Sequence, residues 1–183
     1  MIRSAISMIV LYVLILGCSS GQKQKQPILF DASSLPCDMA KQPDVAKLCG
    51  ISVADMIFQT LTNTATQKVC TYYKNAQPEP LPLINLSTEL NQDKNTNYDS
   101  FFDDLVKNGL PMTDGISKFK KFQDDRFKAV TSDSNPNYNQ IYLEVEKQAL
   151  LIIEYDKSLV KNKDVEEFER KLIELYLFGG PQL

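Results

Sequence analysis

The chain has 183 residues, with 20 Lys and Arg against 23 Asp and Glu and no histidine, so its formal net charge is −3 at pH 7. A mildly acidic chain without a dense basic stripe is not expected to bind nucleic acid. The absence of histidine excludes Ser-His-Asp and Cys-His catalysis, histidine-ligated haem and the common zinc enzyme sites.

The chain begins with the pattern of an export signal. Arg3 supplies a positive charge, and Ala5 to Leu16 form a mostly apolar run that is too short to span a bilayer core of about 30 Å. The run ends in Ile15-Leu16-Gly17-Cys18. These four residues resemble the lipobox of bacterial lipoprotein precursors, which implies cleavage before Cys18 and acylation of Cys18. An ordinary secretory signal with a chance cysteine, or a signal anchor, is the alternative.

Residues 1–17 are therefore predicted to be a signal peptide and residues 18–27 a polar, lipidated tether. Acyl chains on Cys18 would hold the protein on a membrane. Ser19 and Ser20 lack the aspartate that retains enterobacterial lipoproteins in the inner membrane. The resemblance therefore implies the outer membrane, facing the periplasm, in a Gram-negative organism, and the cell membrane otherwise. Residues 28–183 have the size of one domain.

Three cysteines follow Cys18, namely Cys37, Cys49 and Cys70. An exported protein meets oxidising conditions, so we expect one disulfide with one cysteine left over, and three pairings are open. A helix–turn–helix running through Gly50 would bring Cys37 towards Cys70, which favours that pair. Metal binding by these thiols is disfavoured because the sequence contains no C-x-x-C pair.

The first half of the domain is predicted to contain two helices and a connector. Proline in the first turn and a following Gly50 favour a short helix over Pro43–Leu48. The range Ser52–Ala76 begins with a good N-cap and has apolar residues at helical spacing, although four threonines lower its helix propensity. Prolines near 78–82 give an extended connector, followed by a brief strand over Leu83–Leu86.

Apolar spacing with a period of 3.6 residues dominates the second half. Tyr98 to Val106 form an amphipathic stripe that ends at Gly109, and Asp164 with Glu167 resembles the capping box of a last helix that ends at Gly179. Helices are predicted over residues 98–106, 116–130, 138–160 and 165–176. The domain is thus predicted to be mainly α, a bundle of about five to six helices.

Two stretches of the second half share a pattern. Residues 95–134 and 135–178 each begin with an Asn-rich loop, a tyrosine and an amphipathic stretch, which would fit a duplicated pair of helices. Coincidence of Asn-rich caps is the alternative. Both loops also have oxygen ligands at EF-hand-like spacing, but Tyr98 or Tyr138 replaces the turn glycine of that motif. Helix capping is therefore favoured over Ca²⁺ binding.

Candidate catalytic groups are few. Paired carboxylates occur at Asp103/Asp104, Asp124/Asp125 and Glu166/Glu167. Each pair lies on a predicted amphipathic helix and is best explained as a solvated face. The sequence contains no P-loop, no G-x-G-x-x-G and no G-x-S-x-G. We therefore predict a protein that is not an enzyme and that has no catalytic residue, metal or cofactor.

The domain is rich in aromatic residues, most of which are expected in the core. Phe119, Phe122 and Phe127 are interleaved with lysines and could instead form an exposed stripe for a partner helix or strand. Core packing is the favoured interpretation of these three rings.

These features favour a membrane-anchored lipoprotein that acts as a non-catalytic binding or assembly accessory of an envelope complex, such as a secretion system. Small helical lipoproteins known as pilotins, which escort secretins to the outer membrane, share this general description, although no pilotin motif is matched residue by residue. The alternative is a surface-displayed lipoprotein that binds a host or environmental ligand. The predicted partners are a membrane, reached through the lipid on Cys18, and a protein of the envelope.

Overall fold

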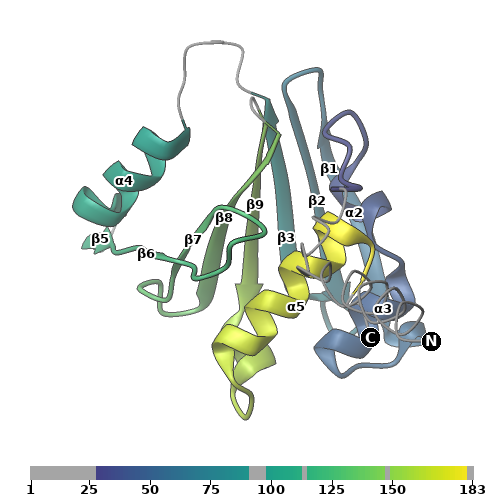
Figure 1. The fold of residues 1–183 in the computed structure, drawn as a ribbon. Helices are drawn as coiled ribbons and strands as arrows, with labels where there is room; N and C mark the ends of the chain where they lie inside the picture. Colours follow the sequence, from purple (N-terminus) through teal and green to yellow (C-terminus); the bar gives the residue numbers. More distant parts are fainter. Residues whose placement is uncertain (1–27, 91–97, 113–114, 147–148, 181–183) are drawn as a thin grey trace, which may run out of the picture.

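The computed structural model describes residues 28–90, 98–112, 115–146 and 149–180 (Figure 1). The predicted signal peptide and tether lie outside these ranges. The helices are α2 (Pro36–Met39), α3 (Gln42–Cys49), α4 (Tyr98–Asn108) and α5 (Val165–Phe178), with the 3-10 helices η1 (Val53–Asp55) and η2 (Lys157–Val160). The strands are β1 (Met56–Asn63), β2 (Gln67–Lys74), β3 (Leu81–Leu90), β4 (Leu110–Met112), β5 (Gly115–Ser117), β6 (Lys120–Lys121), β7 (Ala129–Ser132), β8 (Tyr138–Glu146) and β9 (Ala149–Asp156).

The domain is mainly β, so the predicted all-α bundle is wrong. Seven strands form one antiparallel sheet in the order β1-β2-β3-β9-β8-β7-β6, and β4 pairs with β5 in a separate hairpin. The pairing of β3 with β9 joins residues far apart in the chain, from Ile84 with Tyr155 to Leu90 with Ala149. The sheet, and not a set of packed helices, therefore organises the core.

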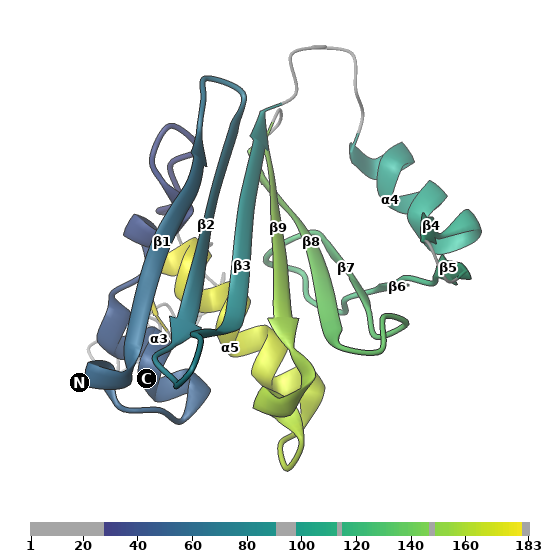
Figure 2. The same cartoon turned by 180° about the vertical axis from the view of Figure 1, so that it is seen from behind.

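Helices α5, α2 and α3 cover one face of the sheet (Figures 1 and 2). The α5 helix begins where the Asp164 carboxylate accepts a hydrogen bond from the Glu167 N–H at 3.0 Å, and it ends at Gly179 in the left-handed conformation. This confirms the helix predicted from the capping box. Its buried apolar side chains are Phe168, Leu172, Ile173, Leu175, Tyr176, Leu177 and Phe178. Each of the larger ones contributes about 1.5–3 kcal/mol when fully buried.

The α4 helix packs against the opposite face, over β7, β8 and β9. Its buried side chains Tyr98, Phe102 and Leu105 lie on the stripe that predicted this helix, so the prediction is confirmed. Gly109 follows at φ 72°, and a Cβ there would lie 2.3 Å from the carbonyl oxygen of Ser117. Only glycine allows the β4–β5 hairpin to approach the end of α4 this closely.

Strands β1 and β2 occupy the range predicted to be one long helix. Ser52 does act as an N-cap, its hydroxyl accepting from the Ala54 N–H at 3.2 Å, but it caps only the short η1. The threonines that lowered helix propensity are β-branched and favour strands. Two neighbouring predictions are confirmed, because α3 ends at a left-handed Gly50 and β3 contains the predicted strand Leu83–Leu86.

The other two predicted helices are also strands. Residues 116–130 contain the end of β5, then β6 and the start of β7, and residues 138–160 contain the β8–β9 hairpin and η2. In β9, Leu151 points into the core under α5, whereas Leu150 and Ile152 point towards α4. A strand covered on both faces is a continuous apolar run, which spacing alone does not distinguish from a buried helix.

The described residues do not show the duplication that the sequence left open. Tyr98 begins helix α4, whereas its predicted equivalent Tyr138 begins strand β8. The first Asn-rich loop, residues 91–97, lies outside the described residues. In the second, the Asn135 side chain accepts from the backbone N–H of Asn137 at 2.9 Å and of Tyr138 at 3.1 Å, so it caps a turn and not a helix. Among the described residues, no helix is long and apolar enough to cross a membrane.

Candidate functional site

A disulfide joins Cys37 of α2 to Cys70 of β2. This is the pair that the sequence favoured, but the reason was wrong, because Cys70 lies on a strand and not on a second helix. Cys49 is free and buried at the end of α3, and burial raises the pKa of its thiol to about 12. A thiol held protonated in this way is a poor nucleophile. Cys18, the predicted lipidation site, lies outside the described residues.

Phe119, Phe122 and Phe127 are all buried. Phe119 contacts Tyr142 under α4, with ring centroids 5.2 Å apart, whereas Phe122 and Phe127 contact each other at 5.7 Å in the core on the α5 side. The segment that carries them is a set of short strands and turns, so the three rings do not share one helix face. They are core residues here and do not form an exposed stripe.

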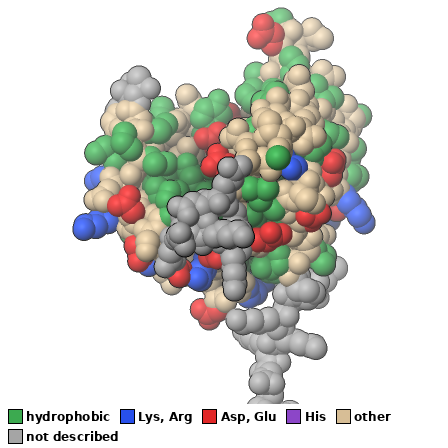
Figure 3. All heavy atoms as spheres, turned by 90° about the horizontal axis from the view of Figure 1, so that it is seen from above, with side chains coloured by type: hydrophobic (Ala, Val, Ile, Leu, Met, Phe, Trp, Pro, Cys, Tyr) green, Lys and Arg blue, Asp and Glu red, His purple; other side chains and the backbone are tan. Residues whose placement is uncertain are grey.

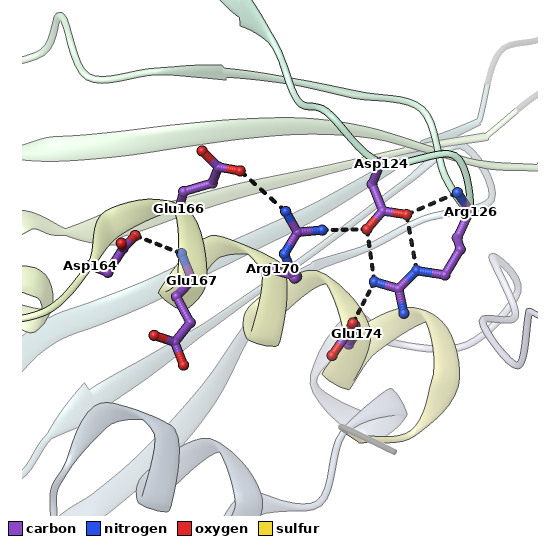
Figure 4. Close-up of polar contacts among 7 residues, drawn as sticks. All are labelled: Asp124, Arg126, Asp164, Glu166, Glu167, Arg170 and Glu174. Atoms are coloured by element: carbon purple, nitrogen blue, oxygen red, sulfur yellow. Dashed lines mark hydrogen bonds and ion pairs between the residues drawn. The ribbon is translucent and has the colours of Figure 1, made fainter. Parts of the chain in front are cut away.

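A charged network joins the β6–β7 loop to α5 (Figure 4). The Asp124 carboxylate accepts hydrogen bonds from the Arg126 guanidinium at 2.9 and 2.7 Å, and another from Arg170. Arg126 also donates to Glu174 at 2.6 Å, and Arg170 donates to Glu166 at 3.1 Å. The Asp124 side chain is almost fully buried, so its charge is held away from water between two arginines.

The contacts of this network stabilise the charged form of Asp124. Hydrogen bonds from Arg126 hold the pKa of Asp124 below its ordinary value, which makes it a poor proton donor. Arg126 lies 5.7 Å from the centre of the Phe127 ring, and Arg170 lies 5.1 Å from that of Phe122. The arginines thus bind the carboxylate and cover two core rings at once. Of the pair Asp124/Asp125, which was expected to be a solvated face, Asp125 is exposed, whereas Asp124 joins the loop to α5.

Replacing Asp124 by Asn should lower the free energy of unfolding by about 1–3 kcal/mol, because both arginines lose their shared charged acceptor in a partly buried site. The neighbouring Asp125 is exposed, so Asp125→Asn is a matched control that should change stability by less than about 0.5 kcal/mol. Urea denaturation at neutral pH measures both variants. Equal midpoints for the two would show that the network does not stabilise the fold.

Three polar side chains form a buried chain of hydrogen bonds beneath α5. The Asn139 amide donates to the Tyr155 hydroxyl at 2.8 Å, and that hydroxyl donates to Glu169 Oε1 at 2.9 Å. Only 3% of Glu169 is exposed, and this burial raises the pKa of its carboxyl to about 7. The group titrates near neutral pH but is sealed beneath a helix. Its titration therefore changes the stability of the fold.

The pKa of Glu169 predicts a pH dependence of stability. A glutamate in the unfolded chain has a pKa of about 4.3. Because the folded value is higher, the folded state binds the proton more tightly. The contribution of Glu169 to stability is full below the unfolded pKa and is lost as the pH rises through the folded value of about 7. At roughly 1.4 kcal/mol per pH unit between the two values, this loss amounts to about 4 kcal/mol.

Glu169→Gln should remove this decline, because an amide keeps the neutral form at every pH. Urea denaturation from about pH 4 to about pH 8 compares the slopes of the wild type and the variant. Glu167→Gln, on the exposed side of the same helix, is the control and should keep the wild-type slope. A Glu169→Gln curve that runs parallel to the wild type would contradict the assignment.

A row of polar side chains crosses the sheet on the face opposite α5. The Thr71 hydroxyl donates to Asn85 at 2.9 Å, and the Asn85 amide donates to Glu154 at 3.1 Å. The Gln140 amide donates to the other oxygen of Glu154 at 2.8 Å. Gln59 of β1 lies beside Thr71 in the register and brings the row to the edge of the sheet. These cross-strand pairs stabilise the register of the strands.

A groove of about 600 Å³ lies between α3 and α5 and is lined by the apolar side chains of Leu48, Phe168 and Leu175. Lysines and carboxylates of balanced charge surround it. Lys163 donates to the Leu48 carbonyl at 3.0 Å and lies 5.1 Å from the centre of the Phe168 ring, and Lys171 pairs with a neighbouring glutamate at 2.6 Å. Four of the six charged residues that line the groove, Lys163, Asp164, Glu167 and Lys171, thus have partners within the protein.

The β4–β5 hairpin exposes apolar side chains. Ile116 is 59% exposed, and Met112 and the opposing Pro111 are exposed as well. We call these three residues the hairpin patch. A hollow of about 200 Å³ lies between the patch and the turn at Pro136. Seen from above, hydrophobic side chains gather on the α4 side of the molecule (Figure 3).

Sequence reasoning missed the hairpin patch because residues 116–130 were assigned to a helix whose apolar stripe would be buried. The signal for a hairpin was available. Pro111 stops the preceding helix, and Gly115 comes only four residues later, a spacing typical of a short hairpin with a turn between.

Within the described ranges, no group of three or more Cys, Asp and Glu side chains is placed to hold a metal ion. The chain matches no family model, no curated protein and no solved structure. The function must therefore be inferred from the geometry of the domain and from the predicted anchor.

Proposed function

We propose that this chain is a membrane-anchored lipoprotein that acts without catalysis, as a binding or assembly accessory of a cell-envelope complex. The observation that carries the proposal is the hairpin patch beside its hollow. Contiguous exposed apolar side chains mark interaction sites on soluble domains. A hollow of about 200 Å³ between Met112, Ile116 and Pro136 has the size to receive one apolar side chain of a partner protein.

The proposed anchor and the hairpin patch lie on different sides of the domain. The Leu29 N–H donates to the Leu177 carbonyl at 2.7 Å, so the described chain begins beside the end of α5. Figure 1 shows that end of α5 next to α2, whereas the hairpin lies with α4 on the other side of the sheet. A ten-residue tether over 18–27 would reach at most about 36 Å. The domain would stay near the membrane with the patch open to a partner.

The likeness to pilotins no longer extends to the fold, because pilotins are helical and this domain is mainly β. The support for an accessory role comes from other features. The lipobox implies an anchor. The carboxylates of Glu169 and Asp124 are held inside the protein by hydrogen bonds and do not line the hollow. The hairpin patch offers apolar contact area and no acid–base pair, which suits binding better than catalysis.

Replacing Cys18 by Ala should release the protein from the membrane, because the residue that carries the acyl chains is gone. We expect the wild type to sediment with carbonate-washed membranes and the variant to remain in the soluble fraction. Ser19→Ala, one residue further on, should behave as the wild type. Sedimentation of Cys18→Ala with washed membranes would contradict the proposed anchor.

Ile116→Asp should reduce binding at the hairpin patch by about tenfold or more, because a charge would replace a central apolar contact. In-cell crosslinking of tagged full-length protein, followed by mass spectrometry, measures recovery of envelope proteins. Leu81→Asp is the control, since Leu81 is 55% exposed but lies at the start of β3. Equal recovery of envelope proteins with both variants would contradict the role of the hairpin patch in binding.

A separate test distinguishes the alternative function. Degradation by protease added to intact cells would instead support surface display and an external ligand.

A further inference from the structure

The two edges of the seven-stranded sheet differ in length and charge. β6 is two residues long, and both are lysines, which protect an edge against pairing. β1 is eight residues long and contains neither a charged residue nor a proline. Ile57 is 42% exposed and Leu61 52%, and Phe58 is also exposed. A long, uncharged edge with exposed apolar side chains is suited to adding another strand.

The contacts of β1 with its neighbours show which backbone groups point outward. The Asp55 carbonyl accepts a hydrogen bond from the residue that follows β2, at 2.7 Å, so Asp55 faces β2. The direction of the backbone N–H and C=O groups alternates along a strand, so those of Met56, Phe58 and Thr60 point away from β2. The Met56 carbonyl is covered, because it accepts from the Gln42 amide at 2.6 Å. In the described chain, no strand pairs with the outer side of β1 at Phe58 and Thr60.

The side chains of β1 are arranged symmetrically about Gln59. Phe58 and Thr60, whose backbone N–H and C=O groups point outward, lie one position on either side of it. The exposed Ile57 and Leu61 lie two positions away. Two β1 strands paired antiparallel about Gln59 would exchange backbone hydrogen bonds between Phe58 and Thr60. The same register would place Ile57 of each copy opposite Leu61 of the other. Regular pairing would end there, because a bulge follows Thr60.

We propose that β1 is a self-association edge, at which a second copy of this chain adds its own β1 in antiparallel register about Gln59. The inference rests on the proposed function in one respect, the membrane anchor. Two copies anchored in one membrane would meet at a raised local concentration. A strand without charge creates no like-charge repulsion when it pairs with itself.

The polar row on the face opposite α5 supports the same register. It runs from Gln140 through Glu154, Asn85 and Thr71 to Gln59. With Gln59 at the centre of the contact, the rows of the two copies meet, and the two amide side chains can bond to each other.

Neighbouring registers lack these features. Pairing centred on Phe58 would place Ile57 opposite Gln59, and pairing centred on Thr60 would place Ile57 opposite Asn63. Only the register about Gln59 sets apolar side chains opposite each other at both ends of the contact.

Cysteine crosslinking of the full-length protein in cells tests the proposal. Directly opposed residues that do not exchange hydrogen bonds have Cα atoms about 4.5 Å apart, within reach of a disulfide. We expect Gln59→Cys to give a covalent dimer on non-reducing gels. Lys120→Cys, on the other edge of the sheet, should stay monomeric. Adding Ile57→Lys to Gln59→Cys should lower the dimer yield by about tenfold, and its exposed position means that the fold should tolerate the change.

Two further variants test the register. Ile57→Cys and Leu61→Cys, expressed together on copies with different tags, should crosslink to each other. Each variant alone should give at least about tenfold less dimer, since the proposed register pairs each position with the other and not with itself.

A monomeric Gln59→Cys protein would overturn self-association, and so would a Gln59→Cys protein linked to a different protein. Both outcomes leave the proposed function intact if the wild type still sediments with membranes and Ile116→Asp still reduces crosslinking to envelope proteins. Conversely, a Gln59→Cys dimer in a protein that fails those two tests would support the edge and contradict the proposed function.

Discussion

Strand β9 pairs with β3 on one side and with β8 on the other, and both of its faces are buried. Leu151 and Ile153 pack under α5, while Leu150 and Ile152 pack towards α4. Within the sheet, the hairpin of β1 and β2 is joined to the strands of the C-terminal half only through the pairing of β3 with β9. Loss of this one strand would therefore separate the two halves of the sheet and expose both core clusters. The rest of the structure depends on it.

The sequence predicted helices well where a boundary signal and an amphipathic stripe agreed. The Asp164 cap and the left-handed Gly179 bound α5, and the stripe from Tyr98 forms α4, which ends just before the left-handed Gly109. The predictions failed in β1, β2, β8 and β9. In β9 the apolar run reflects cover on two faces, which arises only when distant segments pack on it. In β2 the spacing of Val69 and Tyr72 fits a helix, whereas that of Cys70 and Tyr72 fits a strand, and only the pairing with β3 decides between them.

The same dependence on distant contacts explains which site residues could be predicted. The Cys37–Cys70 pair was favoured on a helical argument that the fold does not support, because the disulfide joins a helix to a strand. The buried Glu169 lies on a helix that was predicted, but its partners Tyr155 and Asn139 lie on a hairpin that was not. A charged residue on an amphipathic helix is normally expected in solvent. No feature of the sequence around Glu169 indicates that its side chain is buried.

The α5 helix is attached to the sheet by polar as well as apolar contacts. Asp124 joins it to the β6–β7 loop near one edge, and Glu169 joins it to β8 and β9 near the centre. The β1 edge lies beyond both contacts, on the side where the described chain begins (Figures 1 and 2). Two domains joined through β1 would keep both proposed tethers near the contact and carry a hairpin patch on each outer side. A complex with two equivalent binding sites could then be held by two weak contacts at once, which raises overall affinity by about 10²–10⁴ without any new contact. An apolar patch as small as the β4–β5 hairpin could in this way serve an assembly role that one copy alone would serve poorly.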